Sequence, residues 1–225
     1  MPSQITISLL GSILIDGEIM KDRPSIAYIH EFFGDSSPPE QFHSMIDCSL
    51  ILPGYEGAVL SDECEGNCLT WERYGGAVAE AIQSIQSPFT LVGNSMGAMV
   101  AIYAAMNTSL IDKIILYRIP RFGEARLSLR KKYQEISHSI TDENTYTQFL
   151  RAINEHTDPS VMRVLEKTRW NIARKLYDGA SLSDLDPTVL HQMQQSVILV
   201  EHDFKEDYLH PKEAYHSLQS LLAKF

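Results

Sequence analysis

Hydrophobic residues in this chain gather in short uninterrupted runs, which longer stretches of mixed character separate. Such runs of β-branched and leucine residues are typical of parallel strands that are covered on both faces. The runs that we interpret as strands are 25–29, 49–52, 89–92, 113–117 and 196–200. Residues 4–9 (QITISL) alternate instead and follow no basic run, so we expect a strand there and not a signal peptide.

The stretches between these runs have the periodicity of helices. Residues 70–85 place Val78, Ala81, Ile82 and Ile85 on one stripe, as in a helix with one buried face. Residues 96–106 are small and apolar on nearly every side, which is typical of a helix packed against a sheet. Strands that alternate with helices predict an α/β fold with a mainly parallel sheet flanked by helices.

The middle of the chain differs, because no convincing strand occurs between about residues 121 and 195. We expect helices at roughly 125–139, 142–154 and 158–177, and Asp158-Pro159 is a good helix start. This pattern predicts a helical lid (121–190) inserted into an α/β core, and the core would comprise residues 1–120 and 191–225. A last helix is expected from Pro211 to Lys224.

Composition and charge narrow the functional classes. Hydrophobic residues make up 44% and charged residues 21%, which is ordinary for a globular domain, and the net charge of −10 argues against nucleic-acid binding. No apolar run is long enough to span a membrane. The three cysteines fit a reducing cytoplasm, and Cys64 and Cys68 lack the partners of a metal site. Because no phosphate- or dinucleotide-binding motif occurs, we expect no metal or organic cofactor.

The segment Gly93-Asn94-Ser95-Met96-Gly97 has the pattern G-x-S-x-G between a buried strand and an apolar helix. In such a turn the serine lies on a strained backbone, and its hydroxyl projects from the sheet. The two glycines are needed where neighbouring chain passes too close for a Cβ. The following helix directs its N–H groups toward negative charge that develops beside the serine.

Two further motifs follow strands: His30-Glu31-Phe32-Phe33-Gly34 and Leu52-Pro53-Gly54-Tyr55-Glu56-Gly57. Together with the serine turn, the helical insertion and Glu201-His202-Asp203, this order resembles the α/β-hydrolase superfamily over residues 5 to about 220. The chain is most similar to small lidded members such as esterases, carbon–carbon hydrolases and the menaquinone-pathway lyase.

The resemblance implies roles for individual residues. Ser95 matches the nucleophile, and the N–H groups of Phe32 and Met96 match the oxyanion hole. Asp203 lies where the family has the acid that orients the histidine. Glu31 stands where the family normally has glycine, and a carboxylate pointing inward there would oppose an oxyanion.

The family's catalytic histidine follows one further strand, which from Asp203 would fall past residue 225. Four explanations stay open: a natural loss, a truncated chain, a histidine from a second chain, or a local substitute. The local candidates are His30, His202, His210 and His216. We expect His210, which precedes a proline, to begin a helix, and we take His30 as the best-placed substitute base because its loop lies beside Ser95.

Residues 118–175 carry twelve Lys/Arg against seven Asp/Glu, so a basic segment lies inside an acidic protein. Arg118 and Arg121 follow a strand at the edge where ligands bind in parallel sheets, and we expect them to grip an anionic group. The alternative for both arginines is an ion pair with the acidic core.

The function that we expect is a cytoplasmic serine hydrolase or lyase of a small ester, thioester or carbon–carbon substrate that carries an anionic group. The rival hypothesis is a degenerate member that lacks the histidine and either binds a ligand or partner, or catalyses an elimination or cyclisation. An exposed edge strand would also favour pairing between two copies of the chain.

Overall fold

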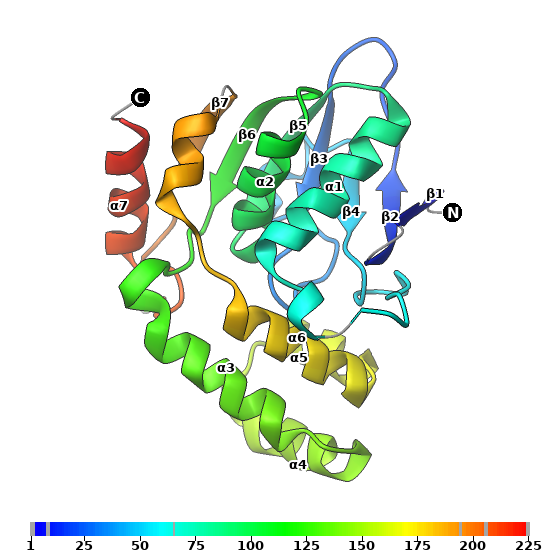
Figure 1. Ribbon diagram of the computed structural model, residues 1–225, viewed down its shortest axis with the longest axis vertical. Helices are drawn as coiled ribbons and strands as arrows, with labels where there is room; N and C mark the ends of the chain where they lie inside the picture. The colour runs from blue at the N-terminus through cyan, green and yellow to red at the C-terminus, as the bar shows by residue number, and fades with distance from the viewer. Residues whose placement is uncertain (1–2, 8–9, 65, 194, 205–206, 224–225) are drawn as a thin grey trace.

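The computed structural model describes residues 3–7, 10–64, 66–193, 195–204 and 207–223. In these residues a seven-stranded sheet has the order β1-β2-β4-β3-β5-β6-β7 (Figure 1). The strands are β1 (Ser3–Ile7), β2 (Gly11–Gly17), β3 (Ser25–Ile29), β4 (Cys48–Ile51), β5 (Phe89–Asn94), β6 (Ile111–Tyr117) and β7 (Ser196–Val200). β1 and β2 pair antiparallel to their neighbours, whereas β3 to β7 are parallel.

Two helices cover one face of this sheet. α1 (Trp71–Ile85) begins at Thr70, whose side chain accepts a hydrogen bond from the N–H of Arg73. α2 (Met96–Asn107) follows β5 directly and is buried along nearly its whole length, as its apolar sequence predicts. Figure 1 shows both helices in front of the central strands, and their side chains form the main hydrophobic core with β3, β4 and β5.

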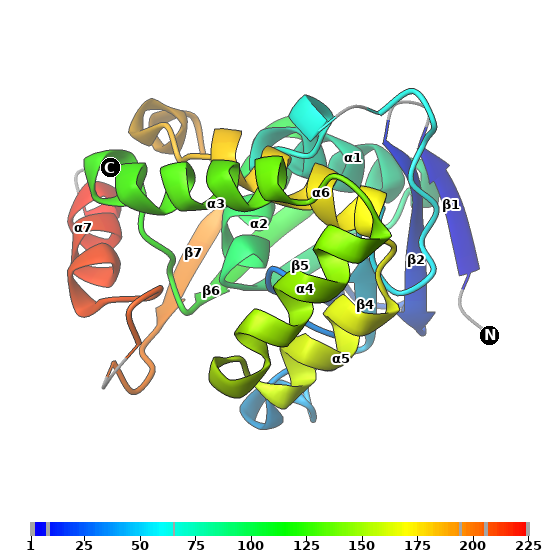
Figure 2. The same ribbon diagram turned by 90° about the horizontal axis from the view of Figure 1, so that it is seen from below.

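The other face of the sheet carries a smaller hydrophobic cluster. Tyr28, Val92 and Ile115 from the central strands pack there against Phe42, which comes from the connection between β3 and β4. α7 (Lys212–Leu222) lies at the β7 edge of the sheet, as both Figure 1 and Figure 2 show. The central strands β3, β4 and β5 are therefore largely buried on both faces, which explains their continuous apolar runs. The run at 196–200 was also expected to be a buried strand, but the residues of β7 are half-buried or exposed.

Between β6 and β7 the chain forms helices, and the described residues contain no strand there. These helices are α3 (Leu127–Ser139), α4 (Glu143–Ile153), α5 (Pro159–Lys167) and α6 (Trp170–Leu182). Figure 2 looks onto the carboxyl ends of the strands and shows these four helices in front of them. The division between core and lid at residues 121 and 190 stays a prediction.

Two expectations about the elements need correction. The strand β2 was not expected, although Ile13 and Ile15 are buried and Leu14 and Asp16 are more exposed, an alternation that is typical of a strand. The helix expected at 158–177 is two helices, because Thr168 and Arg169 are extended and end α5 before α6 begins. The end of the strand expected at 4–9 lies outside the described residues.

The described part of the chain contains no helix that is both long and apolar enough to cross a membrane.

Candidate active site

The turn at Ser95 has the strained geometry that its sequence pattern predicts. Ser95 has φ 53° and ψ −113°, a left-handed backbone that non-glycine residues rarely adopt. A Cβ on Gly93 would lie 2.3 Å from the carbonyl oxygen of Gly97, and a Cβ on Gly97 would lie 2.2 Å from that of Ile29. The expectation that close backbone excludes side chains at both glycines is therefore confirmed.

The hydroxyl of Ser95 contacts a histidine from the far end of the chain. His210 Nε2 lies 2.6 Å from Ser95 Oγ, and His210 Nδ1 lies 2.8 Å from Asp207 Oδ1. An ionised carboxylate can only accept, so Nδ1 donates to Asp207 and Nε2 accepts from the serine hydroxyl. His210 is 2% exposed and Ser95 9%, so water has little access to this chain of hydrogen bonds.

The short segment between β7 and α7 sets the position of both residues. The backbone N–H of His210 donates to Asp207 Oδ1 over 3.1 Å, so one carboxylate holds both the main chain and the ring of the histidine. Pro211 follows and keeps His210 out of the helical conformation, and α7 begins only at Lys212. The side chain of His210 is thereby directed away from α7 and toward Ser95.

The surroundings set the charge states of this pair. Burial alone would raise the pKa of Asp207, but the hydrogen bond and charge of His210 and the nearby Arg118 guanidinium hold it well below its usual range. Burial lowers the pKa of His210, and Arg118 lowers it further, against the opposing effect of Asp207. Asp207 is thus ionised and His210 neutral near pH 7, which are the states that a general base and its orienting acid require.

His30, the residue expected to act as the base, has other contacts. His30 is buried, its Nδ1 donates to Glu31 O at 2.9 Å, and its Nε2 accepts from Leu52 N–H at 3.3 Å. Burial lowers the pKa of His30 to about 4. Where His30 and Asp203 were expected, the described contacts instead place His210 against Ser95 and Asp207 against the imidazole of His210.

Arg118 fixes the position of the acid. Its Nε and Nη2 atoms donate to Asp207 Oδ2 over 3.3 and 3.1 Å, and its Nη1 donates to Glu31 Oε2 over 3.0 Å. The backbone of Arg118 has φ 51°, a left-handed conformation that brings its side chain back to this cluster. His202 Nε2 lies 3.5 Å from the same Asp207 oxygen.

Arg118 and Arg121 were both expected to grip the substrate, and both are already engaged by the protein. Arg118 serves Asp207 and Glu31, as described above. Arg121 donates from Nε to Tyr208 O at 2.9 Å and stacks its guanidinium 4.5 Å above the Tyr208 ring. The alternative, pairing with the protein itself, thus describes Arg118 better than substrate binding does.

Glu31 does not oppose an oxyanion in the way that its position suggested, because its carboxylate is paired with Arg118. Burial raises the pKa of Glu31, and the charge of Arg118 acts against this rise. Met96 is the first residue of α2, where a backbone N–H has no partner within the helix. Phe32 and Met96 both line the cavity at Ser95, and their role as the oxyanion hole stays a prediction.

A cavity of about 540 Å³ opens beside Ser95 and His210, a volume that suits a small-molecule ligand. The helices beyond β6 supply much of its wall, which is largely apolar. The apolar and aromatic residues that line it include Phe32, Phe33, Trp71, Leu129, Tyr133, Ile136, Phe149 and Tyr177. Within the described residues no group of three His, Cys, Asp or Glu side chains is arranged to hold a metal ion.

Comparison with known proteins gives similarity in structure only. No protein-family model matches the sequence, and no curated protein matches it.

Three solved structures illustrate the similarity. A hydrolase from Pseudomonas aeruginosa PA01 is 16% identical with a TM-score of 0.69, over 99% of this chain and 86% of that one. A malate-bound thermophilic esterase from Thermogutta terrifontis is 15% identical with a TM-score of 0.68, over 99% and 86% of the two chains. MenH from S. aureus is 15% identical with a TM-score of 0.65, over 93% and 85%. The chain therefore has the α/β-hydrolase fold, as its sequence pattern predicted.

Proposed function

We propose that the protein is a serine hydrolase of small acyl compounds, with Ser95 as nucleophile, His210 as general base and Asp207 as the acid that orients the imidazole. The observation that carries this proposal is the 2.6 Å contact between His210 Nε2 and the hydroxyl of a serine on a strained turn. The structural neighbours named as hydrolases and esterases support the same general class.

In the first half of the reaction, Ser95 Oγ attacks the acyl carbon while His210 Nε2 accepts the hydroxyl proton. The N–H groups of Phe32 and Met96 would stabilise the oxyanion. The imidazolium then gives its proton to the leaving group, and an acyl-serine remains. In the second half, His210 takes a proton from water, the resulting hydroxide attacks the acyl-serine, and the free acid and Ser95 are released.

The cavity favours an acyl group with apolar bulk, because aromatic and aliphatic side chains form most of its wall. α3, α4 and α6 contribute Tyr133, Phe149 and Tyr177 to this wall. We therefore expect residues 121–190 to act as a lid that sets specificity. The rival hypothesis of a degenerate binding protein rested on a missing histidine, and the contact of His210 with Ser95 supports the enzyme instead.

The test is covalent labelling with a fluorophosphonate, read by intact mass. The unmodified protein should gain one adduct, Ser95→Ala should gain none, and His210→Ala should react at least about 10³-fold more slowly. A panel of p-nitrophenyl esters should be hydrolysed with the same pattern. An unlabelled but folded protein, or labelling that survives Ser95→Ala, would overturn the proposal.

A further inference from the structure

Arg126 is a buried cation in the wall of the cavity that contains Ser95. It is the last residue of a short 3₁₀ turn (Gly123–Arg126) that leads into α3, and it is 3% exposed. The cavity touches Arg126 as well as Ser95 and His210. A charged side chain so deep in a largely apolar wall needs an explanation.

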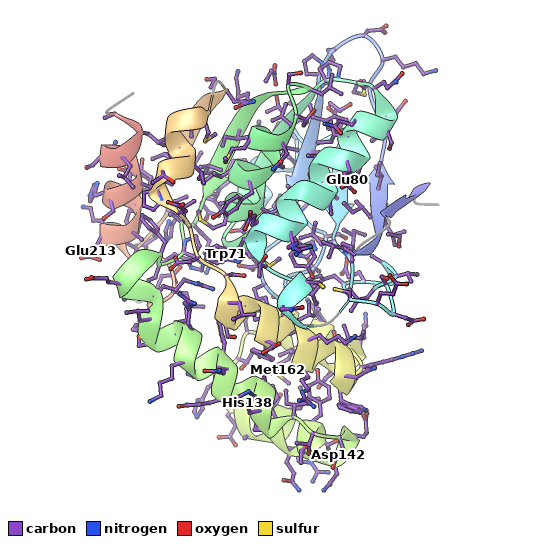
Figure 3. The ribbon with its side chains drawn as sticks, viewed as in Figure 1. Trp71, Glu80, His138, Asp142, Met162 and Glu213 are labelled. Atoms are coloured by element: carbon purple, nitrogen blue, oxygen red, sulfur yellow. The ribbon has the colours of Figure 1, made fainter. Side chains whose placement is uncertain are left out.

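The guanidinium of Arg126 contacts main-chain oxygens and aromatic rings. Its Nε donates to Ser183 O over 2.9 Å, and its Nη2 donates to Ala180 O over 3.1 Å. Its central carbon lies 4.0 Å from the centre of the Trp71 ring. Figure 3 labels Trp71 at the first turn of α1, and the backbone N–H of Trp71 donates to Ser183 Oγ over 3.2 Å, directly after the end of α6. These contacts fix the guanidinium in one place, and they come from carbonyl oxygens and aromatic rings.

No carboxylate of the described residues forms an ion pair with Arg126. Asp184, the nearest acidic group in sequence to these carbonyls, pairs with Arg130 at 3.6 Å and accepts from the N–H of Gly123 at 2.8 Å. Burial lowers the pKa of Arg126 to about 10, which still leaves the group charged at pH 7. An unpaired buried cation is unfavourable, and an anion supplied by a ligand would remove that cost.

The acidic residues of the cavity are also occupied. Glu31 is paired with Arg118, and Asp158 accepts hydrogen bonds from the backbone and hydroxyl of Ser160 at the start of α5. Lys132 also lines the cavity but is exposed to solvent, so Arg126 is a buried cation that lies among apolar side chains. This combination matches a single carboxylate on an apolar chain better than a dianionic phosphate, which would need further donors.

We propose that Arg126 binds a carboxylate on the acyl part of the substrate, so that the preferred substrates are monoesters or monothioesters of dicarboxylic acids with an apolar linker. The substrate class rests on the serine hydrolase function proposed above. Arg126, Trp71 and Met96 all line the cavity that contains Ser95, and the guanidinium of Arg126 packs on the Trp71 ring. A bound acyl chain would run from Ser95 along this wall to Arg126.

The competing explanation is that Arg126 only fastens the end of α6 through its carbonyls. Arg130 provides the matched control, because its Nε donates to Ser181 O over 2.8 Å at the same helix end. Arg130 is not among the residues that line the cavity in the described part of the chain. A purely structural role would make the two arginines respond alike.

The experiment is calorimetric binding of monoethyl suberate and diethyl suberate to Ser95→Ala, in which turnover is blocked. We expect the monoester to bind at least about tenfold more tightly than the diester, as a charge-assisted hydrogen bond implies. Adding Arg126→Gln should weaken monoester binding about tenfold or more and leave diester binding unchanged. Adding Arg130→Gln should leave both within about twofold.

Equal binding of the two esters by Ser95→Ala would overturn the inference without any change at Arg126, so the result does not depend on how well that variant folds. Equal losses with Arg126→Gln and Arg130→Gln would also overturn it. A parallel assay measures turnover of matched p-nitrophenyl esters by the unmodified protein. If binding shows the carboxylate preference but no ester is hydrolysed, the proposed function fails and the Arg126 site stands. If neutral esters are hydrolysed and no preference appears, only the inference about Arg126 fails.

Discussion

Replacing Arg118 by glutamine removes the cation that holds Asp207, the residue that we propose as the acid. Arg118 donates twice to Asp207, over 3.1 and 3.3 Å, and once to Glu31. Glutamine keeps a polar side chain, but it carries no charge and cannot bond to both Asp207 and Glu31. Asp207 would then be free to rotate, and the imidazole of His210 would lose its fixed orientation.

The size of the effect follows from this geometry. A hydrogen bond to a charged group contributes about 1.5–3 kcal/mol. Arg118 is 31% exposed at its side chain and Asp207 15%, so solvent reduces the contribution to about 1–2 kcal/mol. Since 1.4 kcal/mol corresponds to a factor of ten, kcat/KM should fall by about 5- to 30-fold.

The pH dependence of kcat/KM separates positioning from general loss of stability. His210 must be neutral to accept a proton, so activity falls as pH drops through its pKa, which burial and then Arg118 hold below the ordinary value. Removing Arg118 takes a positive charge away from the imidazolium. The pKa of His210 should therefore rise, and the acid limb of the profile should move to higher pH. The other groups that face His210 are Asp207, His202 and Ser95.

Arg121→Gln is the control, because Arg121 bonds to the main chain of the same loop without contacting Asp207 in any described hydrogen bond. It should change kcat/KM less than about threefold and leave the acid limb in place. The assay is hydrolysis of p-nitrophenyl butyrate between pH 4 and 9, at constant ionic strength. An unshifted acid limb in Arg118→Gln, or equal effects of the two variants, would refute the reasoning.

Three further predictions concern the proposed base, the turn at Ser95 and the start of α4. His210→Ala should lower kcat by about 10⁴-fold or more in ester hydrolysis, whereas His30→Asn should lose stability and keep a serine that fluorophosphonate labels. Gly97→Ala should destabilise the protein by about 3 kcal/mol or more in urea unfolding, because its Cβ would meet main chain at 2.2 Å. The control is Gly76→Ala on α1, which has open space and should add about 0.5–1 kcal/mol. Asp142→Ala should cost about 1 kcal/mol in the same assay, since its side chain caps α4, and an unchanged midpoint would contradict the cap.

The parts of the fold that could be predicted from the sequence are those in which one local pattern decides the structure. Continuous apolar runs indicated the parallel strands, and G-x-S-x-G indicated the turn because close packing at Gly93 and Gly97 permits no side chain. β2 was missed because it is antiparallel and lies near the edge of the sheet, where burial alternates and the apolar run is short. The break between α5 and α6, at Thr168 and Arg169, contains no glycine or proline, so no signal in the sequence indicates it.

The acid and base that we propose from the structure, Asp207 and His210, differ from those expected from the sequence for another reason. The resemblance to the family placed the acid at Asp203 in Glu201-His202-Asp203, directly after β7, and placed the histidine beyond one further strand. In the structure, Asp207 bonds to both the backbone and the ring of His210, three residues later. The signal that could have identified them is an aspartate three residues before a histidine that precedes proline. Such a histidine is extended rather than helical, and a local carboxylate can orient it.

This arrangement makes Asp207 and His210 one local structural unit. Asp207, His210 and Pro211 lie within one short loop. The distance and orientation between the carboxylate and the imidazole therefore depend on this loop alone and not on the positions of two separate strands. A length change between β7 and this loop would displace acid and base together relative to Ser95 and would leave their mutual contact intact. The segment Asp-Tyr-Leu-His-Pro is thus a unit that protein engineering could graft after the last strand of another sheet, beside a serine that lacks a base.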